Sequence, residues 1–313
     1  MPLRQEHAPT LRRRAWRAVI RLDGRTPRPD APAPGWQYGQ MPDEAKVELG
    51  QVQQTLFFPL LARAQETQSK RPLLSDPKAV ELVDAINFNA ATFQTGMRFI
   101  VLIRTMILDW WIRQFLASHP GGTVVELGTG LNTRFERTDN GSVHWIDLDL
   151  PDTIELRRQF FADTSRRRML AASLLDEDWL SAVEELPGPY FFVSDGVLVY
   201  LREQDVTSTL ARIATRFPGS SFAFDTYPQA ALKWEHKMAA RRGIARWQWP
   251  CDDPRTLERL GLHLVESASP TRPPAGVRSA LPARYRYLLP LVDPVLGRSL
   301  TLSLFRASPG HPS

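Results

Sequence analysis

The chain has 313 residues, of which 43% are hydrophobic, which suits one large domain with elaborations better than two separate domains. A single cysteine excludes an internal disulfide and a thiolate zinc cage, and we expect no metal site. The net charge of +5 raises nucleic acid or an acidic ligand as a partner. The N-terminus lacks an apolar signal core, and charged residues interrupt the longest apolar stretch, Phe99–Leu116, so we expect a cytoplasmic protein with no membrane partner.

The first 40 residues are rich in arginine and proline. Three consecutive arginines stand at Arg12–Arg14, and four prolines follow between Pro27 and Pro34. This composition predicts a poorly ordered basic arm over residues 1–40, with a helical turn around Leu11–Leu22. We interpret it as a solvated arm. An RNA- or partner-binding arm is the alternative, but no RNA-recognition motif accompanies it, so we expect no nucleic-acid partner.

Residues 41–120 carry helical patterns ahead of the first strand. Helical spacing covers Gln51–Glu66, and an N-cap signal opens a second helix over Lys78–Ile86. A longer helix is predicted over Ala91–His119, where Pro120 and the glycines after it end the pattern. We expect these helices to form an N-terminal cap over the domain that follows.

From residue 121 to 313, strand patterns alternate with helical ones, which predicts an α/β fold with a mostly parallel sheet of seven strands. Strands are predicted over residues 123–127, 143–148, 168–172, 190–195, 220–225, 261–266 and 299–306. Helices are predicted over residues 131–136, 151–162, 177–184, 203–216, 228–243 and 253–259. A Pro-rich insertion from Ser269 to Pro294 separates the last two strands.

The most informative stretch runs from Thr123 to Pro151. A β-branched run leads into a turn that contains Gly128 and Gly130, and Asp147 and Asp149 end the next strand roughly 20 residues further on. A glycine turn lets the backbone approach a ligand closely. A carboxylate at the tip of the neighbouring strand can accept hydrogen bonds from both ribose hydroxyls. The pattern therefore predicts a nucleoside site.

The same stretch indicates which nucleoside. Thr133 stands at the third glycine position of a dinucleotide fingerprint, so the pyrophosphate motif is incomplete. The pattern E-x-G-x-G followed by an acid at the end of the next strand resembles the S-adenosylmethionine (SAM) site of class I methyltransferases. The longer strings LGTGLNTRFER and WIDLDLPDTIELRR resemble the leucine carboxyl methyltransferase superfamily. Within it, the match is to the bacterial branch of polyketide-tailoring O-methyltransferases related to the tetracenomycin carboxyl methyltransferase.

This resemblance extends from about Gln54 to the C-terminus. It implies a class I, Rossmann-like methyltransferase fold over residues 121–313, in which the last two strands form the antiparallel pair that closes the sheet around the C-terminal insertion. It also implies SAM as the cofactor. The cofactor-binding residues expected on this basis are Arg98, Glu126, Gly128, Thr129, Gly130, Asp147, Asp149, Ser173, Leu174 and Asp195.

The resemblance implies a particular role for several of these residues. Asp149 matches the ribose carboxylate, and Asp147 shares its side of the strand, although a helix N-cap is the alternative role for one of the two. Ser173 and Leu174 follow the third strand at the adenine position, where plain core packing is the alternative. Asp195 stands where the family usually has glutamate, and the shorter side chain suggests a contact through water.

Three further residues are expected to be catalytic: Arg98, Arg63 and Tyr200. Arg98 matches the arginine that family members place at the ligand carboxylates, with a surface helix charge as the alternative, and Arg63 matches a basic position close to the pocket. A guanidinium binds a carboxylate bidentately and stays charged at every relevant pH. Tyr200 either lines the pocket or packs against the core.

The acceptor determines whether a general base is needed. An ionised carboxylate is already a nucleophile at neutral pH, whereas a phenol, with a pKa near ~10, needs a base or a metal. Of the six histidines, we expect only His236 to reach the mouth of the pocket. The sequence therefore predicts a SAM-dependent O-methyltransferase that esterifies a small, polyketide-like acid. The alternatives are a phenol or hydroxyl O-methyltransferase, and a SAM-binding protein without transferase activity.

Overall fold

A computed structural model describes residues 56–86, 98–242, 246–296 and 299–309. The basic arm expected over residues 1–40 lies outside the described residues, as do the starts of the helices expected from Gln51 and from Ala91. Within the described ranges, helices precede the first strand, and strands then alternate with helices in the predicted order.

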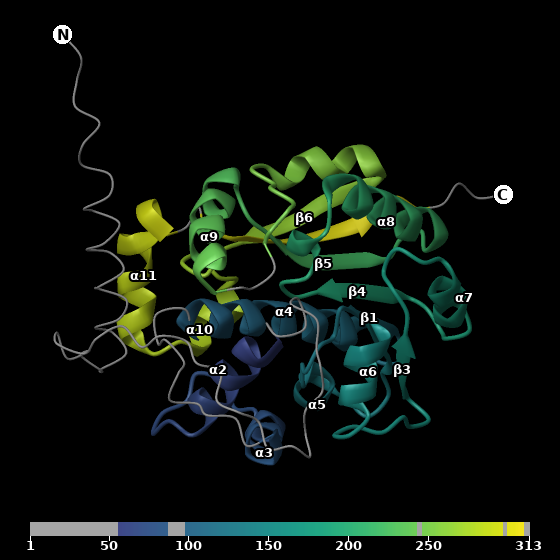
Figure 1. The fold of residues 1–313 in the computed structure, drawn as a ribbon, viewed down its shortest axis with the longest axis horizontal. Helices are drawn as coiled ribbons and strands as arrows, with labels where there is room; N and C mark the ends of the chain where they lie inside the picture. Colours follow the sequence, from purple (N-terminus) through teal and green to yellow (C-terminus); the bar gives the residue numbers. More distant parts are fainter. Residues whose placement is uncertain (1–55, 87–97, 243–245, 297–298, 310–313) are drawn as a thin grey trace, which may run out of the picture.

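The strands form one sheet, which Figure 1 shows between its flanking helices. They are β1 Thr123–Leu127, β2 His144–Asp149, β3 Arg167–Ala171, β4 Tyr190–Ser194, β5 Ser221–Thr226, β6 Leu262–Ala268 and β7 Thr301–Ala307. Their order is β3-β2-β1-β4-β5-β7-β6, with β7 antiparallel to both of its neighbours and the other pairs parallel. Successive strands are added on one side of β1 as far as β3, and then on its other side from β4 onward. At such a switch point, α/β sheets bind ligands at the carboxyl ends of the strands.

The apolar content of the strands explains the parallel centre of the sheet. The sequence of β1 is TVVEL and that of β4 is YFFVS, and every residue of β1 is buried. Parallel strands that are covered on both faces carry nearly continuous apolar runs. At the edge, β6 instead alternates buried with more exposed residues, because only part of its surface is covered.

Helices cover both faces of this sheet. They are α2 Phe57–Thr67, α3 Pro77–Ile86, α4 Arg98–Ser118, α5 Arg134–Thr138, α6 Pro151–Arg157, α7 Asp178–Glu184, α8 Glu203–Arg216, α9 Gln229–Arg242, α10 Ala275–Ala280 and α11 Ala283–Leu296, with the 3-10 helices η5 Leu198–Tyr200 and η6 Pro254–Leu260. None of the described helices combines the length and the apolar character needed to cross a bilayer.

Three apolar clusters hold these layers together. The first lies on the face covered by α4 and contains Ile107 and Trp145. The second lies on the opposite face with α7 and α8, and contains Phe192 and Leu210. The third joins α2 and α3 to α6 and β3, so the N-terminal helices are packed onto the β2–β3 side of the molecule.

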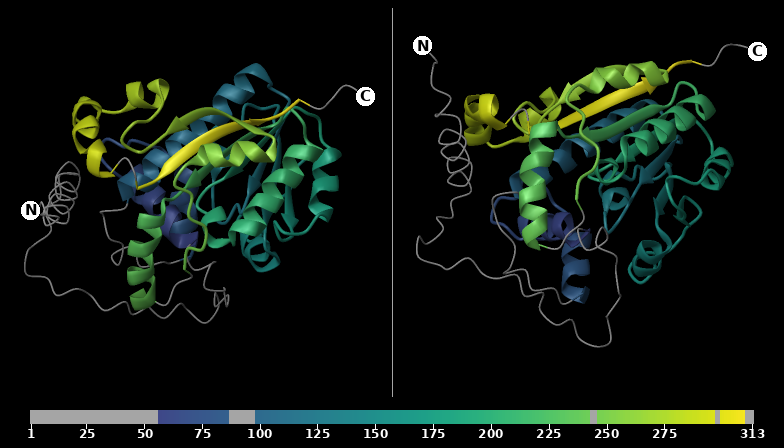
Figure 2. Two further views of the ribbon diagram at one scale, coloured as in Figure 1. Left: turned by 90° about the horizontal axis from the view of Figure 1, so that it is seen from above. Right: turned by 45° about the horizontal axis from the view of Figure 1, so that its top comes forward.

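The Pro-rich insertion between β6 and β7 folds into α10 and α11, two helices that the sequence did not predict (Figure 2). Pro282 precedes α11, and Pro290 lies inside it. Tyr285 and Leu289, one turn apart, are buried, and the Tyr285 ring stacks on Phe99 with centroids 5.1 Å apart. This packing outweighs the backbone hydrogen bond that Pro290 cannot donate.

Candidate functional site

The glycine turn follows β1 at the carboxyl edge of the sheet. Gly128 has a φ of 71° and Gly130 a φ of 52°, which lie in the left-handed region that favours glycine. A Cβ on Gly128 would lie 2.5 Å from Cγ2 of Val197, and one on Gly130 would lie 2.7 Å from Cδ2 of Leu56. Three segments therefore meet here: the turn itself, the chain after β4, and the residue that precedes α2.

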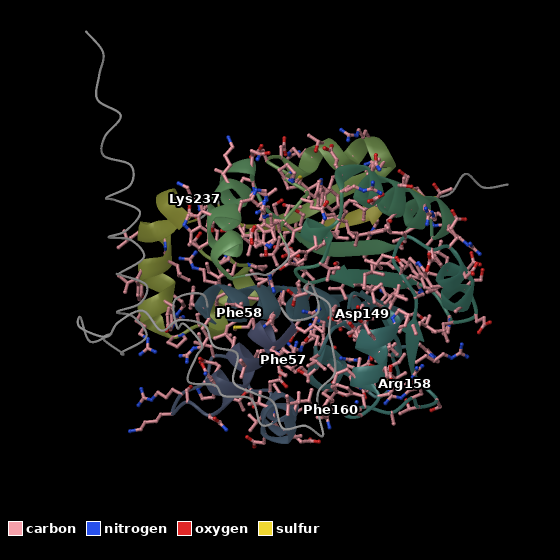
Figure 3. The ribbon with its side chains drawn as sticks, viewed as in Figure 1. Phe57, Phe58, Asp149, Arg158, Phe160 and Lys237 are labelled. Atoms are coloured by element: carbon pink, nitrogen blue, oxygen red, sulfur yellow. The ribbon has the colours of Figure 1, made fainter. Side chains whose placement is uncertain are left out.

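Asp149 ends β2 beside this turn, where Figure 3 labels it. Its Oδ2 accepts the backbone N–H of Gly130 at 2.7 Å, and its Oδ1 accepts that of Leu150 at 2.7 Å. Burial raises the pKa of the carboxyl group, and the two N–H groups partly offset that rise. A carboxylate offers about four lone-pair sites, so acceptor capacity remains for ribose hydroxyls.

Asp147 has a different environment. Its Oδ1 accepts hydrogen bonds from the Thr129 hydroxyl at 2.9 Å and from the Trp145 indole at 3.0 Å. Its Oδ2 lies 2.6 Å from Nε of Arg167 and 3.1 Å from Nη2 of Arg157. These contacts fill the lone pairs of a fully buried carboxylate. The geometry therefore favours Asp149 over Asp147 as the ribose acceptor, and Thr129 serves the same buried network.

Ser173 and Leu174 lie in the turn after β3. The Ser173 hydroxyl accepts the N–H of Leu175 at 3.1 Å, and its backbone N–H donates to Asp176 at 3.1 Å. Leu174 is buried in the second apolar cluster, whereas Leu175 is exposed. The turn stands at the carboxyl edge next to β2, and the adenine contact expected here stays a prediction.

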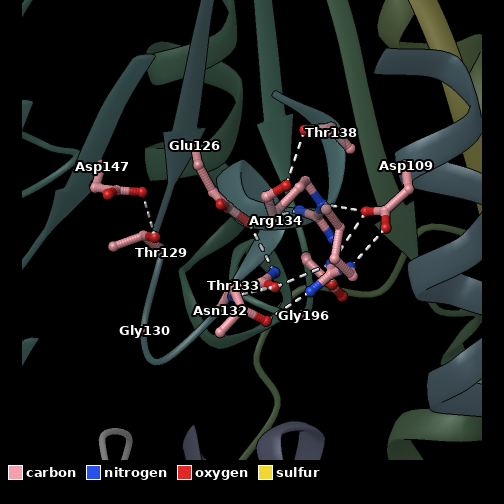
Figure 4. A network of polar contacts seen from close by, with 12 residues as sticks. Asp109, Glu126, Thr129, Gly130, Asn132, Thr133, Arg134, Thr138, Asp147 and Gly196 are labelled. Carbon is pink, nitrogen blue, oxygen red and sulfur yellow. Dashed lines mark hydrogen bonds and ion pairs between the residues drawn. The ribbon is translucent and has the colours of Figure 1, made fainter. Parts of the chain in front are cut away.

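A network of buried charges adjoins the glycine turn (Figure 4). Its centre is Arg134 of α5, which is fully buried. Nε of Arg134 donates to Asp109 at 2.9 Å, Nη1 to Glu126 at 2.5 Å, and Nη2 to Asp195 at 2.7 Å. One guanidinium thus joins α4, β1 and the chain after β4, which fixes the relative positions of the segments around the turn.

Glu126 is held inside this network. Its Oε1 accepts hydrogen bonds from Arg134 and from the side-chain amide of Asn132, at 2.8 Å in the latter case. Its Oε2 is buried and has no hydrogen-bond partner among the described residues. Burial raises the pKa of Glu126 to about 7, although Arg134 opposes the rise. An unpaired acceptor two residues before Gly128 suits a cationic ligand group, so the residues present fit a bound SAM.

Asp195 follows β4 and faces two arginines. Its Oδ1 lies 2.5 Å from Nε of Arg104, and its Oδ2 lies 2.7 Å from Nη2 of Arg134. Burial acts to raise the pKa of Asp195, but the two guanidinium groups hold it below its usual range. Only 6% of the side chain is exposed. The water-mediated cofactor contact expected for Asp195 stays a prediction.

The two arginines predicted to be catalytic both lie buried near the N-terminal helices. Arg63 of α2 donates from Nε to Asp76 at 2.8 Å and from Nη2 to the Leu131 carbonyl at 3.1 Å. Arg98 opens α4, and its Nη2 lies 3.5 Å from Oε2 of Glu66. Each arginine therefore faces an acid, and Arg63 ties α2 to the segment just past the glycine turn.

Tyr200 ends η5 and packs against the first apolar cluster. Its backbone carbonyl accepts the side-chain amide of Gln248 at 2.7 Å, which holds the segment before η6 against η5. In the same segment, the Trp247 ring lies 4.2 Å from that of Tyr227. Nε2 of His236 lies 2.7 Å from the Trp247 carbonyl, so an aromatic group adjoins the carboxyl ends of β4 and β5.

Three residues of this edge were missing from the predicted site: Arg104, Asp225 and Tyr227. Nη1 of Arg104 donates to the Tyr227 hydroxyl at 2.8 Å and lies 3.2 Å from Oδ2 of Asp225, while Tyr227 donates to that oxygen at 2.7 Å. The available signal was a pair of charges, Arg104 and Asp109, within an apolar helix. Both are buried, whereas Arg113, the third interrupting charge, is exposed.

The sheet order, the glycine turn after β1 and the acid that ends β2 define a class I methyltransferase fold. The profile of the family described as leucine carboxyl methyltransferase matches residues 57–214. The tetracenomycin polyketide synthesis O-methyltransferase TcmP of Streptomyces glaucescens is 36% identical over 221 residues, which cover 68% of this chain and 80% of that protein. The SAM-dependent methyltransferase dpfgK of Gibberella zeae is 29% identical over 245 residues, which cover 70% and 82%.

The chain belongs to the leucine carboxyl methyltransferase family. This confirms the predicted class of enzyme, a SAM-dependent methyltransferase. A crystal structure from Thermobifida fusca, whose own methyltransferase assignment is provisional, superposes with a TM-score of 0.51 at 17% identity, over 79% of this chain and 94% of that one. The likeness supports the α/β fold alone.

Proposed function

We propose that this enzyme transfers the methyl group of SAM to the carboxylate of a small, polyketide-like aromatic acid. The observation that carries the proposal is the composition of the carboxyl edge of β1, β4 and β5. Buried arginines gather there, and the one histidine predicted near the pocket mouth is already hydrogen-bonded. That composition suits an anionic acceptor that needs no deprotonation.

Different residues of this chain are assigned to different parts of the methyl donor, SAM. When bound, SAM supplies a methyl group carried on a positively charged sulfur. We assign its ribose to Asp149 and its methionyl part to the turn at Gly128 and Gly130. The unpaired Oε2 of Glu126 offers a hydrogen-bond acceptor beside the same turn. Leu56 and Arg63 adjoin this turn from the N-terminal side, which supports a capping role for the N-terminal helices within residues 41–120 and a core over 121–313.

The hydrogen bond of His236 weakens the phenol alternative. Nε2 lies 2.7 Å from the Trp247 carbonyl, and a carbonyl oxygen can only accept, so Nε2 carries the proton in this contact. That nitrogen cannot also remove a proton from a phenol. An ionised carboxylate needs no base, because its pKa lies well below neutral pH. Positioning the two reactants can then supply roughly 7–11 kcal/mol of the rate enhancement.

The acceptor class follows from two lines of support. The rings of Tyr227 and Trp247 lie together near the carboxyl ends of β4 and β5, and Tyr200 lies in the adjoining η5, which suits a flat aromatic group. The relative TcmP is named for tetracenomycin polyketide synthesis, which supports an acid of polyketide type.

The test is methyl transfer from labelled SAM to a panel of planar aromatic acids, each paired with its carboxamide, with phenols, and with RNA. We expect label on acids alone. The product should release labelled methanol in alkali, because a methyl ester hydrolyses there and a methyl ether does not. Alkali-stable label on phenols, or label on RNA, would contradict the proposal.

A further inference from the structure

Arg104 of α4 is held by side chains at the carboxyl ends of β4 and β5. Its Nε lies 2.5 Å from Asp195, and its Nη1 contacts both the Tyr227 hydroxyl, at 2.8 Å, and Asp225, at 3.2 Å. Two strands thereby orient one guanidinium, because Asp195 follows β4 and Asp225 lies in β5. The residue is 8% exposed. A planar group held from two sides has little freedom left to lose on binding a ligand.

One nitrogen of this group remains available. Nη2 of Arg104 has no hydrogen-bond partner among the described residues, although every other nitrogen of the guanidinium faces an oxygen. A Cβ on Gly196 would lie 3.2 Å from Nη2 and 3.1 Å from Nη1, so the guanidinium lies directly against the backbone of this glycine. The Arg104 side chain is 10% exposed, so a donor without a protein acceptor at this position is open to a ligand.

The position of Nη2 relates it to the methyl donor. Gly196 is followed by Val197, and it is Val197 that a Cβ on Gly128 would meet at 2.5 Å. The guanidinium is therefore one residue away from the chain that contacts the glycine turn. Along the carboxyl edge, the order is the ribose acid Asp149 at β2, the glycine turn at β1, and then Arg104 at the ends of β4 and β5.

We propose that Arg104, through Nη2, binds the carboxylate of the acceptor and directs one of its oxygens toward the methyl donor. The inference rests on the proposed carboxyl methylation and adds the residue that selects for an acid. The two carboxylates around Arg104 are shared with other donors: Asp195 also pairs with Arg134, and Asp225 also accepts the Tyr227 hydroxyl and the Gly196 N–H, so neither is committed to Arg104 alone.

The reaction balances without a proton donor or acceptor. A carboxylate oxygen forms a bond to the methyl carbon, the carbon–sulfur bond breaks, and its electron pair stays on sulfur as a neutral thioether. The other carboxylate oxygen keeps its hydrogen bond to Nη2 during the transfer. The product ester is neutral, so it loses its ion pair with Arg104 and can keep only a hydrogen bond to its carbonyl oxygen. Arg104 therefore favours binding of the acid and release of the ester.

The deciding variants are R104Q and R104K, assayed with the best acid from the aromatic panel and with its carboxamide as a competitive inhibitor. We expect R104Q to raise the KM for the acid about 10- to 100-fold and to abolish the preference for acid over carboxamide, with S-adenosylhomocysteine affinity within about threefold of wild type. R104K should restore part of the acid preference, because it restores the charge without the planar fork. R113K, an exposed arginine on the same helix, is the matched control and should behave as wild type.

A purely structural role for Arg104 would lower the folded fraction without changing the ratio of acid to carboxamide affinity. An unchanged ratio in R104Q would therefore overturn the inference while the wild-type activity stands. Should R104Q fail to fold, Y227F decides, because it removes only the hydroxyl that orients Nη1 and should raise the acid KM severalfold. A wild-type enzyme that binds S-adenosylhomocysteine but labels no acid would instead overturn the proposed function, and this inference with it.

Discussion

Asp147 and Asp149 lie two residues apart on one strand, but they differ in their hydrogen-bond and ion-pair partners. Asp147 lies inside β2, where Arg157 and Arg167 neutralise it. Asp149 ends the strand, and its described partners are backbone N–H groups rather than arginines. Only the second carboxylate keeps acceptor capacity for a ligand. The sequence placed both on the same side of the strand and could not separate them, since their difference arises from arginines on other elements.

This difference predicts opposite outcomes for matched substitutions. D149N should weaken S-adenosylhomocysteine binding by about 10- to 100-fold at a stability cost of about 1–3 kcal/mol, because the amide keeps one acceptor oxygen and leaves one of the two backbone N–H groups unpaired. D147N should instead destabilise the fold by about 3–5 kcal/mol, since buried Arg157 loses its anion and Arg167 keeps only the partly exposed Glu136. Calorimetric titration and urea unfolding of both variants check this. Equal loss of ligand affinity in the two variants would contradict the assignment of the ribose to Asp149.

The contribution of buried Glu126 to folding stability depends on pH. Burial raises its pKa from the ordinary 4.5 to about 7, so the folded protein binds this proton more tightly than the unfolded chain does. Stability from this group is therefore full below about pH 4.5 and is lost as pH rises through about 7. The wild type should lose stability relative to E126Q across this window, by an amount on the order of 3 kcal/mol. Urea unfolding at about pH 5 and about pH 8 measures it, and a pH-independent difference would contradict the raised pKa.

At the scale of elements, buried ion pairs join the N-terminal helices to the sheet. Asp76, which precedes α3, accepts from Arg63 of α2 at 2.8 Å, from Arg137 of α5 at 2.9 Å, and from the Thr133 hydroxyl at 2.5 Å. Because α5 follows the glycine turn, one carboxylate connects two N-terminal helices to the segment beside the proposed donor site. Apolar packing in the third cluster adds to this connection but does not fix its register.

Substituting Asp76 tests that connection. D76A should cost about 3–5 kcal/mol of unfolding free energy, because buried Arg63 loses the carboxylate it pairs with and buried Arg137 keeps only Asp109. E81A on α3 is the control: it removes only the exposed ion pair with Lys78, at 2.6 Å, and should cost less than about 1 kcal/mol. Denaturant unfolding followed by tryptophan fluorescence compares the two. Similar costs for the two variants would show that the buried carboxylate does not hold the N-terminal helices.

Local sequence patterns predicted most of the helices and strands, but they did not predict the buried ion pairs. The runs TVVEL and YFFVS predicted β1 and β4 within a residue of their ends, because continuous apolar runs require a covered parallel sheet. The helix α11 was missed because Pro290 indicates a break, whereas tertiary packing, which includes the stacking of Tyr285 on Phe99, supports the helix. Arg104 and Asp109 were interpreted only as charges that interrupt the apolar stretch Phe99–Leu116, since their partners lie more than twenty residues away in the chain.

The strand order places the proposed donor-binding and acceptor-binding groups along one edge of the sheet. Asp149 and the glycine turn occupy the β2–β1 side of the switch point, while Arg104, Asp225 and Tyr227 occupy the β4–β5 side. Charged groups buried between them hold this geometry before any ligand arrives, which is what a reaction driven by positioning requires. The arrangement also distinguishes the donor from a dinucleotide, because the third glycine position is filled.

That position is Thr133, whose side chain is buried and donates to Asp76. A pyrophosphate would need a glycine there for close helix–strand packing. S-adenosylhomocysteine at about a hundred times its Kd should stabilise the protein by about 2.7 kcal/mol and raise its Tm by about 4–8 °C, whereas NAD at the same concentration should leave Tm unchanged. Differential scanning calorimetry of the full chain measures both shifts, and D149N, with its weakened ribose contact, should show a smaller response to S-adenosylhomocysteine. Stabilisation by NAD in place of S-adenosylhomocysteine would mean that the turn after β1 binds a pyrophosphate, because the two ligands share a ribose and differ in what the glycine turn must accommodate.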